Sequence, residues 1–191
     1  MAQDSLGNDL TQVDLPITAA LAIASYSQTN VLASAAGGGA KVTLPEGYRR
    51  LGLIKQDGGA NESMDQDSPI EFFQKGYKLS LDPTISIQWG LAEFNKVVRE
   101  LITGKAPDEN GMITVSTWTP DTKWLVYYEE VYKSGRIRRL NGVMQVTGTE
   151  IDQSERNSVK GRNVTLEWQT DPLIGDGVTS LYNEWQYDPA D

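Results

Sequence analysis

The densest group of side chains able to do chemistry is a run of carboxylates in the first half of the chain. Between Lys55 and Glu71, one lysine stands against five acidic residues: Asp57, Glu62, Asp65, Asp67 and Glu71. Oxygen-bearing side chains alternate from Asn61 to Asp67, which suggests calcium. An EF-hand loop, however, requires glycine at its sixth position and glutamate at its twelfth, where this chain has Gln66 and Phe72. The pattern therefore indicates either a solvated acidic loop or a surface that repels phosphate groups.

The chain contains no histidine and no cysteine. Histidine is the usual general base near neutral pH, and the two residue types together dominate transition-metal sites. Their absence excludes Ser-His, Cys-His and zinc chemistry. A glycosidase could use paired carboxylates, but Glu129 and Glu130 are adjacent in a predicted strand and point to opposite faces. We therefore expect a protein that binds or builds rather than an enzyme, with no metal and no cofactor.

Aromatic residues allow a second interpretation. A sugar-binding surface could be built from stacked rings, whereas aromatic residues at strand spacing are more often core residues or cross-strand pairs. The residues in question are Trp118, Trp124, Tyr127, Tyr128 and Trp168.

The net charge of −9 is unevenly distributed. No basic residue follows Arg162, and six acidic residues occupy that last segment. Such acidity argues against ordinary nucleic-acid binding, which requires cations to neutralise phosphates. The basic residues that gather elsewhere could contact the acidic segment of a neighbouring subunit, or they could simply lie at an exposed hairpin end; they are Arg49, Arg50, Lys133, Arg136, Arg138 and Arg139.

The elements that position these residues are mainly strands. Alternating polar and apolar residues predict half-buried strands at Thr84 to Trp89 and at 158–169. Further strands are expected at 17–26, 50–54, 70–74, 112–118, 123–132 and 136–149, with 50–54 and 70–74 joined as a long-looped hairpin. Residues 32–47 lack periodicity around their glycines and are expected to form a flexible loop.

One segment, at about 91–103, has helical periodicity instead. Its apolar residues fall on one face, and Gly104 supplies a stop; they are Leu91, Phe94, Val97, Val98, Leu101 and Ile102. The sequence thus predicts a mainly β fold, an antiparallel β-sandwich or partly open barrel with one flanking α-helix. We divide it into an N-terminal arm (1–15), a β domain (16–170) and an acidic C-terminal tail (171–191).

The order of these elements resembles that of the major tail tube protein of long-tailed (siphovirus-like) bacteriophages. A strand reaching Gly52-Leu53-Ile54 is followed by Asp57-Gly58, an acidic loop and a strand that ends in Trp89. The helix that comes next carries Glu93-Phe94-Asn95, and two final strands lie around 143–149 and 163–168. The similarity covers residues 16–170 and rests on the layout rather than on a single motif.

The resemblance implies a structural virion protein that forms stacked hexameric rings, with strands of each subunit lining a channel and the helix outside it. Arms and the long hairpin loop would bridge neighbouring subunits, and an acidic channel wall would let viral DNA pass without specific binding. The implied partners are the protein itself, a tape measure protein and the tail terminator or tip proteins, with no membrane. The implied location is the virion tail, with the protein in the host cytoplasm before assembly.

The acidic residues from Asp57 to Glu71 are then candidates to face the lumen, and the basic residues named above are candidates for intersubunit contacts. The alternative is a monomeric β-sandwich module that binds carbohydrate or protein.

Overall fold

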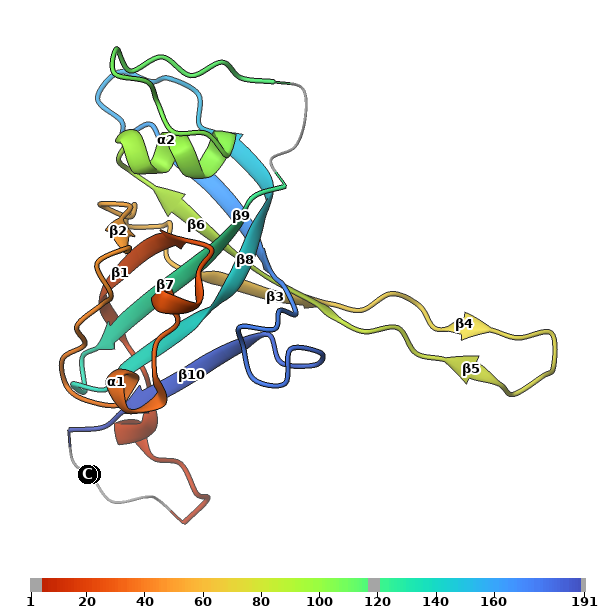
Figure 1. The fold of residues 1–191 in the computed structure, drawn as a ribbon. Coiled ribbons are helices and arrows are strands. Elements are labelled where there is room, and N and C mark those ends of the chain that lie inside the picture. The colour runs from red at the N-terminus through yellow and green to blue at the C-terminus, as the bar shows by residue number, and fades with distance from the viewer. Residues whose placement is uncertain (1–4, 117–120, 190–191) are drawn as a thin grey trace.

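The computed structural model describes residues 5–116 and 121–189 and consists chiefly of one large antiparallel sheet (Figure 1). Its strands are β1 (Pro16–Ser25), β2 (Arg49–Arg50), β3 (Asn61–Asp65), β6 (Thr84–Leu91), β7 (Lys123–Tyr132), β8 (Ile137–Ile151), β9 (Arg162–Trp168) and β10 (Tyr182–Tyr187). A second, two-stranded sheet contains β4 (Ile70–Glu71) and β5 (Lys78–Leu79). The helices are α1 (Ser34–Gly37) and α2 (Lys96–Thr103), with 3₁₀ turns at Leu10–Gln12 and Gln28–Asn30.

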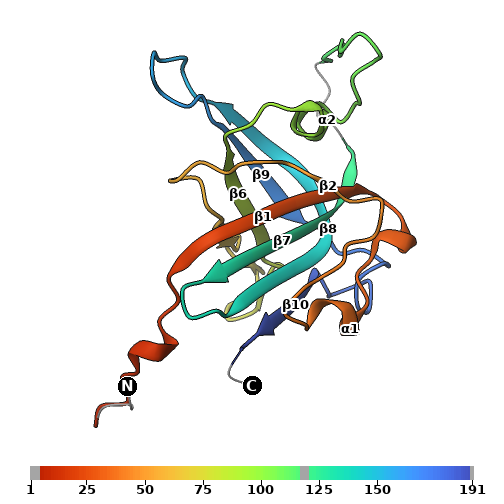
Figure 2. The ribbon, with the colours of Figure 1, turned by 90° about the vertical axis from the view of Figure 1, so that its left-hand side faces the viewer.

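The large sheet follows the order β2-β1-β7-β8-β9-β6-β3, and β10 pairs with the first half of β8. The sheet curves strongly (Figure 2), and the segment 51–55 hydrogen-bonds to β1 and β6, which each lie next to an end strand of the sheet. The amide of Leu51 donates to the carbonyl of Leu21 in β1, and the amide of Lys55 donates to the carbonyl of Gly90 in β6. The described residues nevertheless form no closed barrel. The predicted mainly β, partly open fold is confirmed.

The core lies inside this curve. Ile87 and Trp89 from β6 and Val164, Leu166 and Trp168 from β9 are buried, as their alternation predicts. The ring centroid of Trp89 lies 5.5 Å from the ring centroid of Tyr128 in β7. The helix α2 buries Val98 and Leu101 against the same cluster, with Val97 and Ile102 partly buried beside them.

The helix is shorter than predicted. Leu91 belongs to β6, where it pairs with Arg162, so the chain is still extended at that point. Asn95 then caps α2 by accepting hydrogen bonds from the amides of Val97 and Val98. Phe94 lies before the helix and is 51% exposed, so its predicted role in helix packing is wrong. The expected stop at Gly104 is confirmed, since that residue has a left-handed φ of 69°.

Other differences concern the loops. The 50–54 strand is reduced to β2 and a single bridge at Ile54, and the hairpin partners are β3 and β6 rather than 50–54 and 70–74. Residues 112–116 form no strand, and the rest of that predicted strand lies outside the described residues. The glycine-rich loop contains α1 and is tied down, because Arg139 donates to the carbonyls of Gly37, Gly39 and Ala40. The acidic C-terminal tail, for which no strand was predicted, contributes β10.

Candidate functional site

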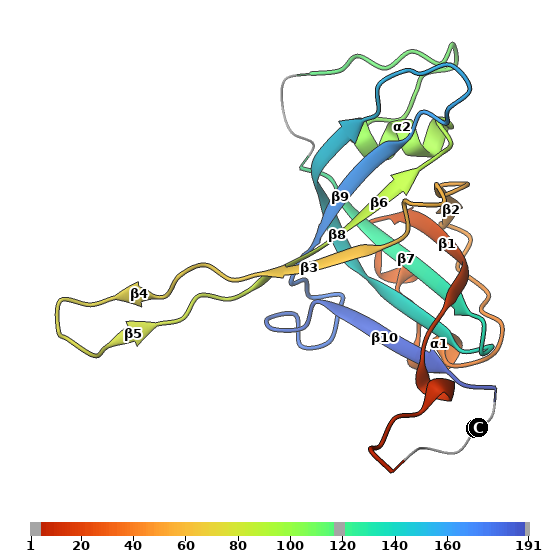
Figure 3. The same cartoon turned by 180° about the vertical axis from the view of Figure 1, so that it is seen from behind.

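The most prominent feature is a hairpin that projects from the body of the molecule (Figures 1 and 3). Its base is the pairing of β3 with β6, in register from Asn61 opposite Gln88 to Asp65 opposite Thr84. Its outer end is the pairing of β4 with β5, and Gly76 makes the turn with φ 96°. Every residue from 61 to 80 is exposed, so this hairpin buries none of its side chains against its own chain.

The hairpin tip (residues 70–79) is apolar despite this exposure. Phe73 is fully exposed and Tyr77 is 70% exposed. The remaining large apolar residues of the tip, each about half exposed, are Ile70, Phe72 and Leu79. Contiguous apolar residues on a protein surface commonly mark a contact site for another molecule. The hairpin tip is therefore the strongest candidate for a binding element.

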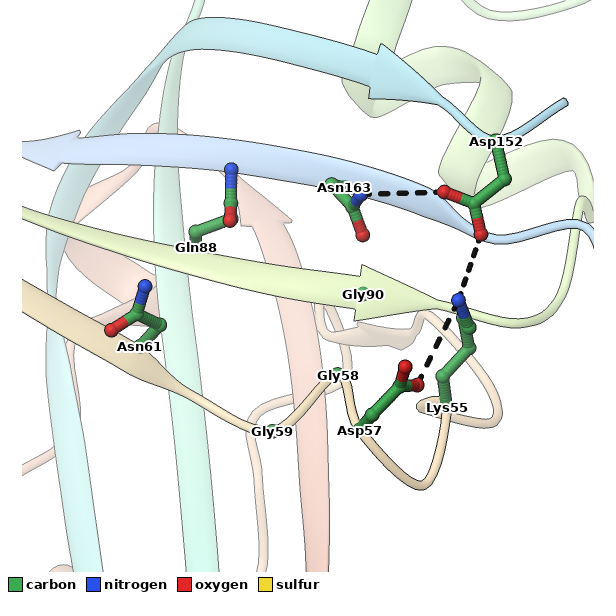
Figure 4. Close-up of a pocket in the computed structure, with 9 residues that line it drawn as sticks. All are labelled: Lys55, Asp57, Gly58, Gly59, Asn61, Gln88, Gly90, Asp152 and Asn163. Atoms are coloured by element: carbon green, nitrogen blue, oxygen red, sulfur yellow. Dashed lines mark hydrogen bonds and ion pairs between the residues drawn. The ribbon is translucent and has the colours of Figure 1, made fainter.

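A polar cavity of about 420 Å³ lies at the root of the hairpin, between the turn 55–59 and the ends of β6 and β9 (Figure 4). The Nζ of Lys55 lies 2.8 Å from the carboxylate of Asp152 and 3.7 Å from that of Asp57. The hydrogen bond from Lys55 is the main reason why the pKa of Asp152 is lowered. Because its one cation, Lys55, is held by the carboxylates of Asp57 and Asp152, the cavity offers hydrogen-bonding groups and a net negative charge.

The five acidic candidates fall into four environments. Asp57 lines the polar cavity. Glu62 forms an ion pair with Arg138, which also holds Glu184 from β10. Glu71 pairs with Lys78 across β4 and β5 at 2.5 Å. Asp65 and Asp67 lie on the hairpin shaft, the segments 61–69 and 80–84 that connect the tip to the body. They have no ion-pair partner among the described residues.

The basic candidates are mostly engaged within their own chain. Arg49 pairs with Glu100 on α2 at 2.5 Å. Arg136 is 7% exposed and pairs with Asp14, and Arg138 is held by two glutamates. Arg139 is completely buried. We therefore do not retain Arg136 and Arg139 as intersubunit contacts, because neither guanidinium is accessible to a neighbouring molecule.

Arg50 and Lys133 are exposed, and no ion pair involves either of them in the described part of the chain. Of the six basic candidates, these two keep a charge available to a partner.

The proposed sugar-stacking residues are mostly part of the core. Trp124, Tyr127, Tyr128 and Trp168 are each at most 4% exposed, and Trp118 lies outside the described residues. The sequence analysis missed the aromatic tip of the hairpin. The adjacent Phe72 and Phe73 were a usable signal, since neighbours in an extended segment point to opposite sides and cannot both enter one core.

No cluster of three or more potential metal-binding side chains occurs within residues 5–116 and 121–189. Over the same residues, no helix combines the length and the apolar character needed to cross a bilayer. No protein-family model matches the chain, and a search of curated proteins finds no match either.

Proposed function

We propose that the protein is a self-assembling structural subunit, and specifically that it forms stacked hexameric rings that build a phage tail tube. The observation that carries the proposal is the projecting hairpin, whose residues 61–80 are all exposed and whose tip is apolar. Such an element would be an aggregation liability in a monomer. In an assembly, the apolar tip would be buried against a neighbouring copy.

The margins of the sheet support the same proposal. Strand β3 ends the sheet on one side, and no strand of the described residues pairs with its outer edge. On the other side, β1 pairs with β2 only at Ala22 and Ile23, which leaves the edge from Pro16 to Ala20 unpaired in the described part of the chain. Two different free edges favour head-to-tail contacts between copies, and such contacts close into rings or continue as filaments.

In this proposal, the acidic hairpin shaft contributes to a channel wall. Asp65 and Asp67 carry charges that no nearby cation neutralises in the described structure. Carboxylates repel the phosphates of DNA, so viral DNA would pass without adhering. A tape measure protein and the tail terminator or tip proteins would be the further partners.

The decisive experiment is negative-stain electron microscopy of the purified chain, together with sedimentation velocity over a range of concentrations and salt. We expect rings and tubes. A 21.1 kDa monomer under every condition would contradict the proposal. Binding to a glycan array by that monomer would instead support the carbohydrate-binding alternative.

A further inference from the structure

We propose that the hairpin tip of one copy docks into an apolar groove beside α2 of another copy. This inference rests on the self-assembly proposed above and identifies the acceptor surface for the hairpin. The groove has a volume of about 520 Å³ and lies between the outer side of α2 and the loop that follows it. The residues that define it are Phe94, Arg99, Ile102, Ile113, Val115 and Ile151.

The groove matches the hairpin tip in its apolar character. Val115 is 74% exposed, and Phe94 and Ile151 are each 51% exposed. The lining of this groove is mainly apolar, in contrast to the polar cavity at the root of the hairpin. Burying one of the exposed rings of Phe72 and Phe73 there would remove apolar area from water on both surfaces.

The groove also offers a cation to an aromatic ring. The guanidinium of Arg162 lies 3.6 Å from the centroid of Phe94, while Arg99 is more distant from that ring, at 6.0 Å. Arg99 lines the groove and forms no ion pair with any described residue. An incoming phenylalanine could stack on this guanidinium, since arginine favours the faces of aromatic rings.

Net charge does not oppose the contact. The hairpin tip carries Lys75 and Lys78 against one acidic residue, Glu71. On the acceptor side, Asp108 and Glu109 in the loop are balanced by Lys105 and by Arg99 of the groove. The docking mode therefore rests on the apolar surfaces rather than on charge.

The contact must join two molecules. The hairpin extends away from the body, whereas α2 lies at the upper end of the body in two opposite views (Figures 1 and 3). A chain therefore cannot place its tip in its own groove without leaving this fold. The tip and the groove are different surfaces, so each copy can insert its tip into one neighbour and accept the tip of another. Repeated contacts of this kind form a ring or a stack.

The natural absence of cysteine makes a disulfide test direct. One preparation carries Phe73→Cys, and a second preparation carries Val115→Cys and a larger tag. The two preparations are mixed, allowed to assemble and mildly oxidised. The control acceptor is Val178→Cys, since Val178 is equally exposed, at 75%, but lies in the loop before β10. We expect a mixed-mass disulfide dimer with the 115 acceptor and none with the 178 acceptor. Equal cross-linking to both acceptors would overturn the docking proposal.

Electron microscopy of the same samples separates this proposal from the proposed function. Tubes without a 73–115 disulfide would refute the docking mode and leave tube formation standing. A 73–115 disulfide in dimers that never form rings would support the docking mode and refute the tube. Monomers without the disulfide would refute both.

Discussion

Arg139 and Glu129 face each other across the pairing of β7 and β8, and the Nε of Arg139 donates to the carboxylate of Glu129 at 2.7 Å. The same guanidinium donates to the carbonyls of Gly37, Gly39 and Ala40. The arginine side chain is 1% exposed and the glutamate side chain 24% exposed. One buried cation therefore joins the glycine-rich loop to the middle of the sheet.

Replacing this cation is expected to destabilise the fold. Arg139→Ala removes the guanidinium that donates to three carbonyl groups and leaves Glu129 with the hydroxyl of Tyr127 but without its cation. Breaking a buried ion pair on one side costs about 3–5 kcal/mol. Urea unfolding followed by tryptophan fluorescence would measure the loss. The matched control is Lys78→Ala, because Lys78 belongs to an ion pair with both side chains more than half exposed. Equal unfolding midpoints for the two variants would contradict a structural role for Arg139.

The pH dependence of stability should report on Asp171. Burial by itself would raise the pKa of this fully buried carboxylate, but hydrogen bonds from Lys123 and Tyr26, at 2.8 and 2.7 Å, and from the Leu173 amide lower it below its usual value. A lowered pKa in the folded state favours the ionised form. The stabilisation is therefore complete above the unfolded pKa of about 3.9 and is lost as the pH falls through the folded pKa.

Asp171→Asn removes that dependence. At pH 7 we expect the variant to be less stable than the wild type by about 1.5–3 kcal/mol, the usual value of hydrogen bonds to a charged group. The difference should shrink as the pH falls below the unfolded pKa of about 3.9 and the wild-type carboxylate becomes protonated in turn. Denaturant midpoints in a series from pH 7 down into the acid range provide the measurement. A gap that stays constant with pH would show that the ionised carboxylate contributes nothing.

The sequence predicted those strands in which one face is buried. Asn163 to Trp168 alternates fully, and β7 coincides with its predicted range because residues 124–128 form a continuous apolar and aromatic run. The short β2 and β10 were harder to predict, since β2 has only two residues and β10 pairs with β8 across a long stretch of chain. No local pattern encodes such a long-range pairing.

The candidate site was predictable only in part. The adjacent Arg138 and Arg139 must point to opposite faces of a strand, so the sequence could tell that one of them turns inward but not which one. The acidic shaft was identified, but its apolar tip was taken for an ordinary strand. The exposure of Phe72 and Phe73 depends on how far the hairpin projects, which the sheet register decides.

Gly58 should be required where the hairpin leaves the body. A Cβ on Gly58 would lie 2.6 Å from the carbonyl oxygen of Gly90 and 2.7 Å from its Cα, both backbone atoms. Gly58→Ala therefore forces the turn 55–59 away from β6, and we expect a loss of about 1–3 kcal/mol, as for other overpacked sites. Gly59→Ala is the control, since a Cβ there meets no atom within 4 Å. Thermal unfolding of the two variants makes the comparison, and similar melting temperatures would refute the close packing.

Reversing the charge of the hairpin shaft tests the channel. The double variant Asp65→Lys, Asp67→Lys should fold normally, because both side chains are exposed. Assembled tubes of this variant should retain DNA in a co-sedimentation assay, with retention decreasing as salt rises, whereas wild-type tubes should not retain it. The control double variant Glu150→Lys, Glu155→Lys adds the same charge at exposed positions outside the hairpin. If both double variants retain DNA equally, overall charge explains the effect, and Asp65 and Asp67 do not line the channel.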